Sequence, residues 1–239
     1  MATKLYVVHG SHPCATIEKV LQLKGMPYKK VEWPPPTHVV AQRLLFGGRT
    51  VPAIRFDDGE KVVGSRAITA RIEERVAEPA LLPDDPAERA AVLAAEEWGD
   101  DVLQPLARRV VWPTLKENAK ASPTFTKGSK LPLPAPAIRL SMPLIARIEM
   151  RINDATVETR AADLAALPAH LDKIDAWIAD GTMGAKPTPN RADLQIGSSL
   201  GLLMTMADLR ALIAPRPAGQ LADELFAIAG SIPAGALSL

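Results

Sequence analysis

A serine, a histidine and a cysteine stand together near the N-terminus, in the segment Ser11-His12-Pro13-Cys14. The apolar run 4–8 before this segment predicts a buried strand, and the amphipathic stretch 15–24 after it predicts a helix. Where a helix begins, its backbone amides and the positive end of its dipole face outward and can stabilise a thiolate or another anion. Pro13 suits such a first turn, because its missing N–H would have no partner there. The segment therefore indicates thiol or anion chemistry.

A second serine, Ser65, opens the predicted helix 66–76. A hydroxyl beside two free backbone amides at a helix N-terminus is a further site for an anion. For both Ser65 and Ser11 the alternative is a structural helix cap, which is a common use of serine.

The elements that must position these serines follow the order βαβαββα within residues 1–77, which form the predicted first domain. A strand, a helix and a strand in about thirty residues form a βαβ unit, so the first two strands are expected to be parallel neighbours. The turn Asp57-Asp58-Gly59 between two apolar runs predicts a hairpin. The strands are expected at 4–8, 26–31, 51–56 and 60–63, and the helices at 15–24, 37–45 and 66–76.

The Pro- and Asp-rich segment 78–86 is the best domain boundary, and the β pattern disappears beyond it. Residues 87–239 are predicted to form an all-helical second domain. A bend is expected at Pro105, bends or breaks are expected at Pro143 and Pro168, and Trp112 to Pro136 is expected to be a mobile loop. The predicted helices span 86–111, 138–153, 159–179, 190–214 and 218–229.

Composition argues against several classes of function. The 239 residues carry a net charge of +1 and no long basic block, so nucleic-acid binding is not expected. No signal peptide is predicted, and the apolar stretch 194–215 contains Asp208 and Arg210, so no membrane association is expected. The single cysteine, Cys14, excludes an intramolecular disulfide, and the four histidines are scattered, so no metal site is predicted. A cytoplasmic location is the expectation.

Several motifs, in this order along nearly the whole chain, resemble those of the bacterial cytosolic glutathione S-transferases. The resemblance implies the glutathione S-transferase fold, an α/β thioredoxin-like domain followed by an all-α domain. Asn190 replaces the usual Ser or Thr of the family's capping box, and with Asp193 it is expected to be structural. The motifs are Ser11-His12-Pro13-Cys14, Leu23-Lys24-Gly25-Met26-Pro27-Tyr28, Arg49-Thr50-Val51-Pro52-Ala53-Ile54, Gly64-Ser65-Arg66-Ala67-Ile68 and Asn190-Arg191-Ala192-Asp193-Leu194.

The resemblance implies glutathione as co-substrate, with its thiolate attacking a small electrophilic or apolar substrate in a detoxification reaction. Ser11 would donate to the sulfur, and such a charge-assisted hydrogen bond is worth ~1.5–3 kcal/mol. At ~1.4 kcal/mol per pKa unit, this bond lowers the thiol pKa by roughly one to two units. Trp98, Leu103 and Trp112 on the long helix would line the substrate pocket. A homodimer is also implied.

The other glutathione contacts are likewise implied by the resemblance. A cis peptide bond at Pro52 would turn the backbone of Val51 toward the cysteinyl unit. Ser65 and the Arg66 amide would bind the γ-glutamyl carboxylate, and Thr50 with Arg49 could reach the glycyl carboxylate. His12 could polarise the sulfur, although a solvent-facing histidine is the default.

Two other functions remain open. Cys14 could act as a glutaredoxin-like thiol–disulfide oxidoreductase if its thiol is exposed, but a small buried residue is the alternative. A non-catalytic binding protein with the same fold is the other, because Gly64 stands where the family has Glu or Gln. The acidic residues Glu96, Glu97, Asp100 and Asp101 could receive an ammonium group or form a solvated helix face.

Overall fold

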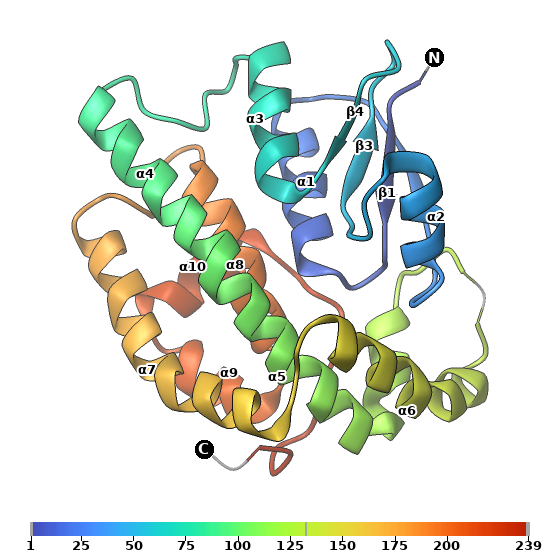
Figure 1. The fold of residues 1–239 in the computed structure, drawn as a ribbon. Helices are drawn as coiled ribbons and strands as arrows, with labels where there is room; N and C mark the ends of the chain where they lie inside the picture. The colour runs from blue at the N-terminus through green and yellow to red at the C-terminus, as the bar shows by residue number, and fades with distance from the viewer. Residues whose placement is uncertain (1, 132, 238–239) are drawn as a thin grey trace.

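A four-stranded mixed sheet with three helices forms the N-terminal part of the chain (Figure 1). The computed structural model describes residues 2–131 and 133–237. The strand order is β2-β1-β3-β4, with β2 parallel to β1 and β3 antiparallel to both β1 and β4. This is the predicted βαβαββα arrangement. Its elements are β1 (Lys4–Val7), α1 (His12–Leu23), β2 (Lys29–Glu32), α2 (His38–Phe46), β3 (Ala53–Arg55), β4 (Lys61–Val63) and α3 (Ser65–Arg75).

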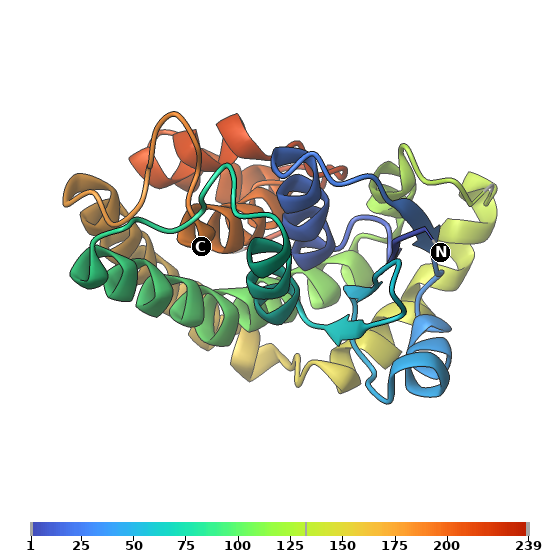
Figure 2. The same ribbon diagram turned by 90° about the horizontal axis from the view of Figure 1, so that it is seen from above.

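The alternation of β1 decides which helices cover which face of the sheet. Leu5 and Val7 are fully buried in a core with residues of α1 and α3. Tyr6 points to the other face, where its ring meets Phe46 of α2 edge-on with centroids 5.0 Å apart. Thus α1 and α3 lie on the side that faces the helical region, and α2 lies on the opposite side (Figure 2).

The rest of the chain is helical and is organised around α8, every residue of which is buried. Helix α8 packs against α4, α5 and α10 and also against α1, so it joins the two regions. Asn190 and Asp193 cap its N-terminus reciprocally, as predicted. The elements are α4 (Pro86–Trp98), a π-helical turn (Gly99–Leu103), α5 (Gln104–Glu117), a 3₁₀ helix (Ala119–Thr126), α6 (Ala135–Ile152), α7 (Val157–Ala179), α8 (Arg191–Leu203), α9 (Ala207–Ile213) and α10 (Pro217–Leu225).

Two absences can be stated for residues 2–131 and 133–237. None of their helices combines the length and the apolar character that crossing a membrane requires. No three or more of their His, Cys, Asp and Glu side chains gather where they could hold a metal ion.

The expected loop from Trp112 to Pro136 is largely helical, which corrects the prediction. Helix α5 continues to Glu117 because Val111, Thr114 and Leu115 extend its buried face past Pro113. Prolines also fail to interrupt two other helices: α6 runs through Pro143 and α7 runs through Pro168. Each proline removes one backbone hydrogen bond, and buried side chains before and after it keep the helix together.

Candidate active site

A cavity of about 200 Å³ lies between the sheet region and the helical region. The sheet side contributes the loop after β1, the segment that leads into α2 and the loop before β3, while the helical side contributes α5, the 3₁₀ helix and α6. The predicted site residues Ser11, His12, Thr50, Val51 and Trp112 all line it. Most of its remaining wall is apolar and includes Trp33, Val111, Leu115, Phe125, Met142 and Ile152.

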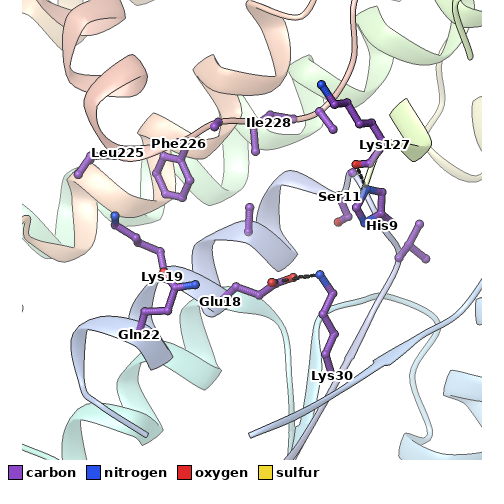
Figure 3. Close-up of a pocket in the computed structure, with 15 residues that line it drawn as sticks. His9, Ser11, Glu18, Lys19, Gln22, Lys30, Lys127, Leu225, Phe226 and Ile228 are labelled. Carbon is purple, nitrogen blue, oxygen red and sulfur yellow. Dashed lines mark hydrogen bonds and ion pairs between the residues drawn. The ribbon is translucent and has the colours of Figure 1, made fainter. Parts of the chain in front are cut away.

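Ser11 stands at the N-cap position of α1, but its side chain accepts no capping hydrogen bond. Its backbone N–H donates to the Val8 carbonyl oxygen at 3.2 Å and closes the turn after β1. A second cavity, of about 290 Å³, also reaches Ser11 from the other side of this turn (Figure 3). There Glu18 and Lys30 form an ion pair at 2.8 Å (Figure 3). The Ser11 hydroxyl is therefore placed at a helix start beside open space and is not committed to the cap.

Cys14 lies one turn further along α1, inside the core of the sheet region. It is 1% exposed. Burial raises the pKa of its thiol to about 12, and a hydrogen bond from the Ser11 side chain opposes this shift only in part. At neutral pH Cys14 is a buried neutral thiol, so the condition of an exposed thiol is not met here, and the alternative of a small buried residue fits its surroundings.

His12 is buried as well, which corrects the expectation of a solvent-facing histidine. Its side chain is packed between the two regions and is 2% exposed. Burial first, and then the positive charge of Arg108, lowers the pKa of His12 well below its usual value, while a hydrogen bond to the Gln104 backbone acts in the opposite direction. The imidazole is therefore neutral at neutral pH and forms part of the cavity wall.

The peptide bond between Val51 and Pro52 is cis, as the resemblance implied. Val51 lines the cavity, whereas Thr50 and Arg49 are exposed on its rim. The Pro52 carbonyl oxygen accepts a hydrogen bond from the Gly64 N–H at 3.0 Å. The loop before β3 is thereby joined to the start of α3 by a backbone hydrogen bond.

The start of α3 differs from the prediction in one respect. Gly64, with φ of 91°, occupies the N-cap position, and Ser65 is the first helical residue, only 3% exposed. Neither Ser65 nor Arg66 lines the cavity at Ser11. The guanidinium of Arg66 donates to Glu97 at 3.0 Å and so connects α3 with α4. An open groove of about 800 Å³ runs between these helices, and Gly64, Arg66, Glu97 and Asp100 line it.

Two of the three predicted pocket residues lie elsewhere. Trp98 packs edge-on against His170 and Trp177 of α7, with ring centroids 5.4 and 5.3 Å apart. Leu103 has no exposed surface and belongs to the core of the helical region. Helical spacing correctly indicated an apolar face here, but that face packs against α7 and α8 rather than against the cavity. Trp112 alone of the three lines the cavity.

Two charged residues of the cavity wall, Arg108 and Glu149, were missed. The Arg108 Nη1 donates to the Gln104 side-chain oxygen at 2.8 Å. Glu149 is 5% exposed; burial raises its pKa to about 7, and the positive charge of Arg108 opposes the shift. A signal for Glu149 existed, because it continues the buried stripe of Ile138, Met142 and Ala146 on α6.

Comparison with known proteins agrees with this geometry. Residues 5–80 match the family described as the glutathione S-transferase N-terminal domain. The chain thus contains a glutathione S-transferase N-terminal domain and has the glutathione S-transferase fold. A maleylacetoacetate isomerase from Pseudomonas aeruginosa is 33% identical over 96 residues, which cover 36% of this chain and 43% of the isomerase. The match thus spans less than half of that relative.

Solved structures share the fold over most of their length. The β-etherase LigF from Sphingobium sp. strain SYK-6 aligns with a TM-score of 0.64 at 18% identity, covering 94% of this chain and 99% of LigF. A maleylacetoacetate isomerase from Anaeromyxobacter dehalogenans, solved with glutathione in its active site, aligns with a TM-score of 0.54 at 21% identity, covering 94% of this chain and 89% of the isomerase.

Proposed function

We propose that this protein is a glutathione-dependent enzyme in which Ser11 activates the glutathione thiol for attack on a small electrophile. The observation that carries the proposal is that Ser11 lines the cavity between the two regions while its hydroxyl makes no capping hydrogen bond to α1. The cis peptide bond before Pro52 and the glutathione bound to the structural relative support it.

In this proposal glutathione extends from Ser11 past Val51 to the start of α3. The backbone of Val51 pairs with its cysteinyl unit, and Thr50 on the rim approaches its glycyl carboxylate. Its γ-glutamyl carboxylate accepts from Ser65 and Arg66 at the N-terminus of α3, where the helix dipole favours an anion. Its ammonium group lies between Glu97 and Asp100 across the groove. These two carboxylates take the part of the Glu or Gln that the family has at the position of Gly64.

At the other end of the tripeptide, the Ser11 hydroxyl donates to the sulfur and stabilises the thiolate. In the structure this hydroxyl donates to the Cys14 thiol, which is a weak acceptor. A hydrogen bond to an anionic sulfur in the cavity would be stronger and would replace it. The thiolate then forms a carbon–sulfur bond with an electrophile in the apolar cavity beside Trp112. It either displaces a leaving group such as a halide, which departs with the bonding electron pair, or adds to an electron-poor double bond, whose other carbon takes up a proton from water. The product is a glutathione thioether, or an isomer of the substrate if the sulfur leaves again.

A titration of the protein with glutathione, monitored by calorimetry, tests the proposal. The wild type is expected to bind glutathione, and the ultraviolet absorbance of the bound thiolate gives its pKa. Ser11→Ala is expected to raise that pKa by roughly one to two units. At neutral pH the thiolate fraction, and with it kcat/KM for a generic aryl halide, then falls ~10- to 100-fold.

Ser129→Ala is the matched control. Ser129 lines the same cavity, but its hydroxyl already donates to Glu32 at 2.8 Å, so the pKa of bound glutathione is expected to stay unchanged. No binding at millimolar glutathione would leave a non-catalytic protein as the better account. Disulfide exchange that disappears only in Cys14→Ala would favour the oxidoreductase instead.

We also propose that two copies of the chain pair through the groove between α3 and α4. Small apolar side chains, among them Ala67, Ala70, Ala90 and Ala94, line this groove between the charged residues. Light scattering on the same samples gives the mass in solution, and a monomer at micromolar concentration would contradict the pairing.

A further inference from the structure

Arg108 is a cation in the cavity wall for which the described residues provide no ion-pair partner. Its Nη1 donates to the neutral side chain of Gln104 at 2.8 Å. Its Nε is buried and has no hydrogen-bond partner within residues 2–131 and 133–237. Burial lowers the pKa of Arg108, and the carboxylates of Asp100 and Glu149 act in the opposite direction from a distance.

The neighbouring Arg109, on the same helix, is an arginine with a structural role. Its Nε and Nη2 donate to the two carboxylate oxygens of Asp163 on α7, at 2.7 and 2.8 Å. This fork-to-fork arrangement satisfies both charges. Of these two consecutive arginines on α5, Arg109 therefore has a carboxylate partner and Arg108 has none among the described residues.

Glu149 does not neutralise Arg108 in the way that Asp163 neutralises Arg109. Both Arg108 and Glu149 line the cavity, yet no ion pair between them lies within 4.0 Å, and the Glu149 Oε1 has no hydrogen-bond partner in the described chain. An unpaired buried cation is unfavourable unless a ligand supplies its partner.

We infer that the electrophile carries a carboxylate, which pairs with Arg108 while the apolar part of the molecule packs between α5 and α6. This inference rests on the proposed function and specifies the substrate class of the same cavity. Trp112 and Leu115, one and two turns along α5 from Arg108, and Met142 on α6 form the apolar wall. A planar guanidinium suits a carboxylate because it offers two parallel N–H donors.

A pair of product analogues tests the inference without any chemical step. S-(4-carboxybenzyl)glutathione and S-(4-carbamoylbenzyl)glutathione have nearly the same shape and differ by one negative charge. In calorimetry the wild type is expected to bind the carboxylate at least about tenfold more tightly than the amide, as for a charge-assisted hydrogen bond. Equal affinities would overturn the inference.

Arg108→Met is the decisive variant. An apolar side chain of similar length removes a buried charge, so folding is expected to survive, and circular dichroism verifies this. The preference for the carboxylate is expected to vanish, while the affinity for S-benzylglutathione, whose benzyl group carries no charge, stays within about twofold. Arg108→Gln, which keeps a polar group, is the second variant, with the same expected loss of preference. A preference that persists in both variants would overturn the assignment to Arg108.

Arg109→Gln is the matched control. It removes a charge of the same kind one residue away, on the face that binds Asp163, and is expected to keep the tenfold preference. A loss of preference in this control would show that the net charge of α5, and not Arg108, selects the ligand. If S-benzylglutathione itself fails to bind the wild type, the proposed function fails. If it binds with no preference among the analogues, only the inference about the carboxylate fails.

Discussion

The N-termini of α1 and α8 use similar residues in opposite ways. At α8 the Asn190 side chain accepts from the Asp193 N–H at 3.0 Å, and the Asp193 carboxylate accepts from the backbone N–H groups of Asn190, Gly184 and Ala185 at 2.9, 2.6 and 3.2 Å. At α1 the Ser11 side chain caps nothing, and the buried His12 Nε2 has no hydrogen-bond partner among the described residues.

The difference separates polar residues that hold the fold from polar residues that await a ligand. A buried polar group without a partner is destabilising, so native proteins leave few of them. Those of this chain that line the cavity between the two regions include His12 Nε2, Trp33 Nε1, Arg108 Nε and Glu149 Oε1. No polar atom of Asn190 or Asp193 is in this state in the described chain. The comparison predicts that changes at α8 affect stability, whereas changes at the cavity affect binding.

Asp193→Ala is expected to have the largest effect on stability. The Asp193 side chain is 0% exposed. Its removal leaves one buried and two partly buried N–H groups without this acceptor, and it removes one half of the reciprocal cap of α8. At about 1–3 kcal/mol for each unsatisfied group, the loss is roughly 4 kcal/mol in the free energy of unfolding. Urea unfolding measures it.

Asp193→Asn is the matched control. It keeps an acceptor oxygen in the same place and is expected to lose less stability. A loss below about 1 kcal/mol for Asp193→Ala would break the comparison, because the α8 cap would then not hold the fold.

Glu149→Gln is expected to change how stability depends on pH. The folded pKa of Glu149 is about 7 and its ordinary value is 4.5, so between these values the folded state binds more protons than the unfolded state. The free energy of unfolding of the wild type therefore decreases as pH rises through this window, by at most roughly 3 kcal/mol. Glu149→Gln removes this contribution.

The measurement is the difference in unfolding free energy between Glu149→Gln and the wild type at several pH values. This difference is expected to grow in favour of the variant from pH 4.5 to pH 7, because other titrating groups cancel. A difference that is constant with pH would show that burial does not raise the pKa of Glu149. The contrast between unpartnered polar groups at the cavity and partnered ones at the α8 cap would then not extend to this residue.

What the sequence allowed us to predict depended on how local the cause was. The strands, the turn around Gly59 and the cap of α8 follow from neighbours in the chain, and the structure confirms them. The cis peptide bond before Pro52 followed from family resemblance. These features need no knowledge of how distant elements pack.

The cavity wall depended on packing between segments far apart in the sequence. His12 is buried because α5 covers the start of α1, and Arg108 and Glu149 line one cavity because α5 packs against α6. The spacing of Trp98 on α4 indicates a buried side but not which helix lies opposite, and α7 lies there. Such pairings have no local signature.

Cys14 gives the smallest expected effect and the sharpest boundary of the site. It lies within one helical turn of Ser11, yet its pKa of about 12, against an ordinary 9.0, means about a thousand-fold less thiolate at a given pH. Iodoacetamide is therefore expected to leave Cys14 unmodified in the folded protein and to alkylate it in urea. Mass spectrometry of the two samples distinguishes these outcomes.

Cys14→Ala is expected to lower the free energy of unfolding by roughly 1 kcal/mol, because a small side chain leaves a small void. It is expected to leave the affinity for glutathione and the pKa of its bound thiol unchanged. Rapid alkylation of the folded protein would show that the thiol opens to solvent. Cys14 would then belong to the ligand site together with Ser11, and not to the core.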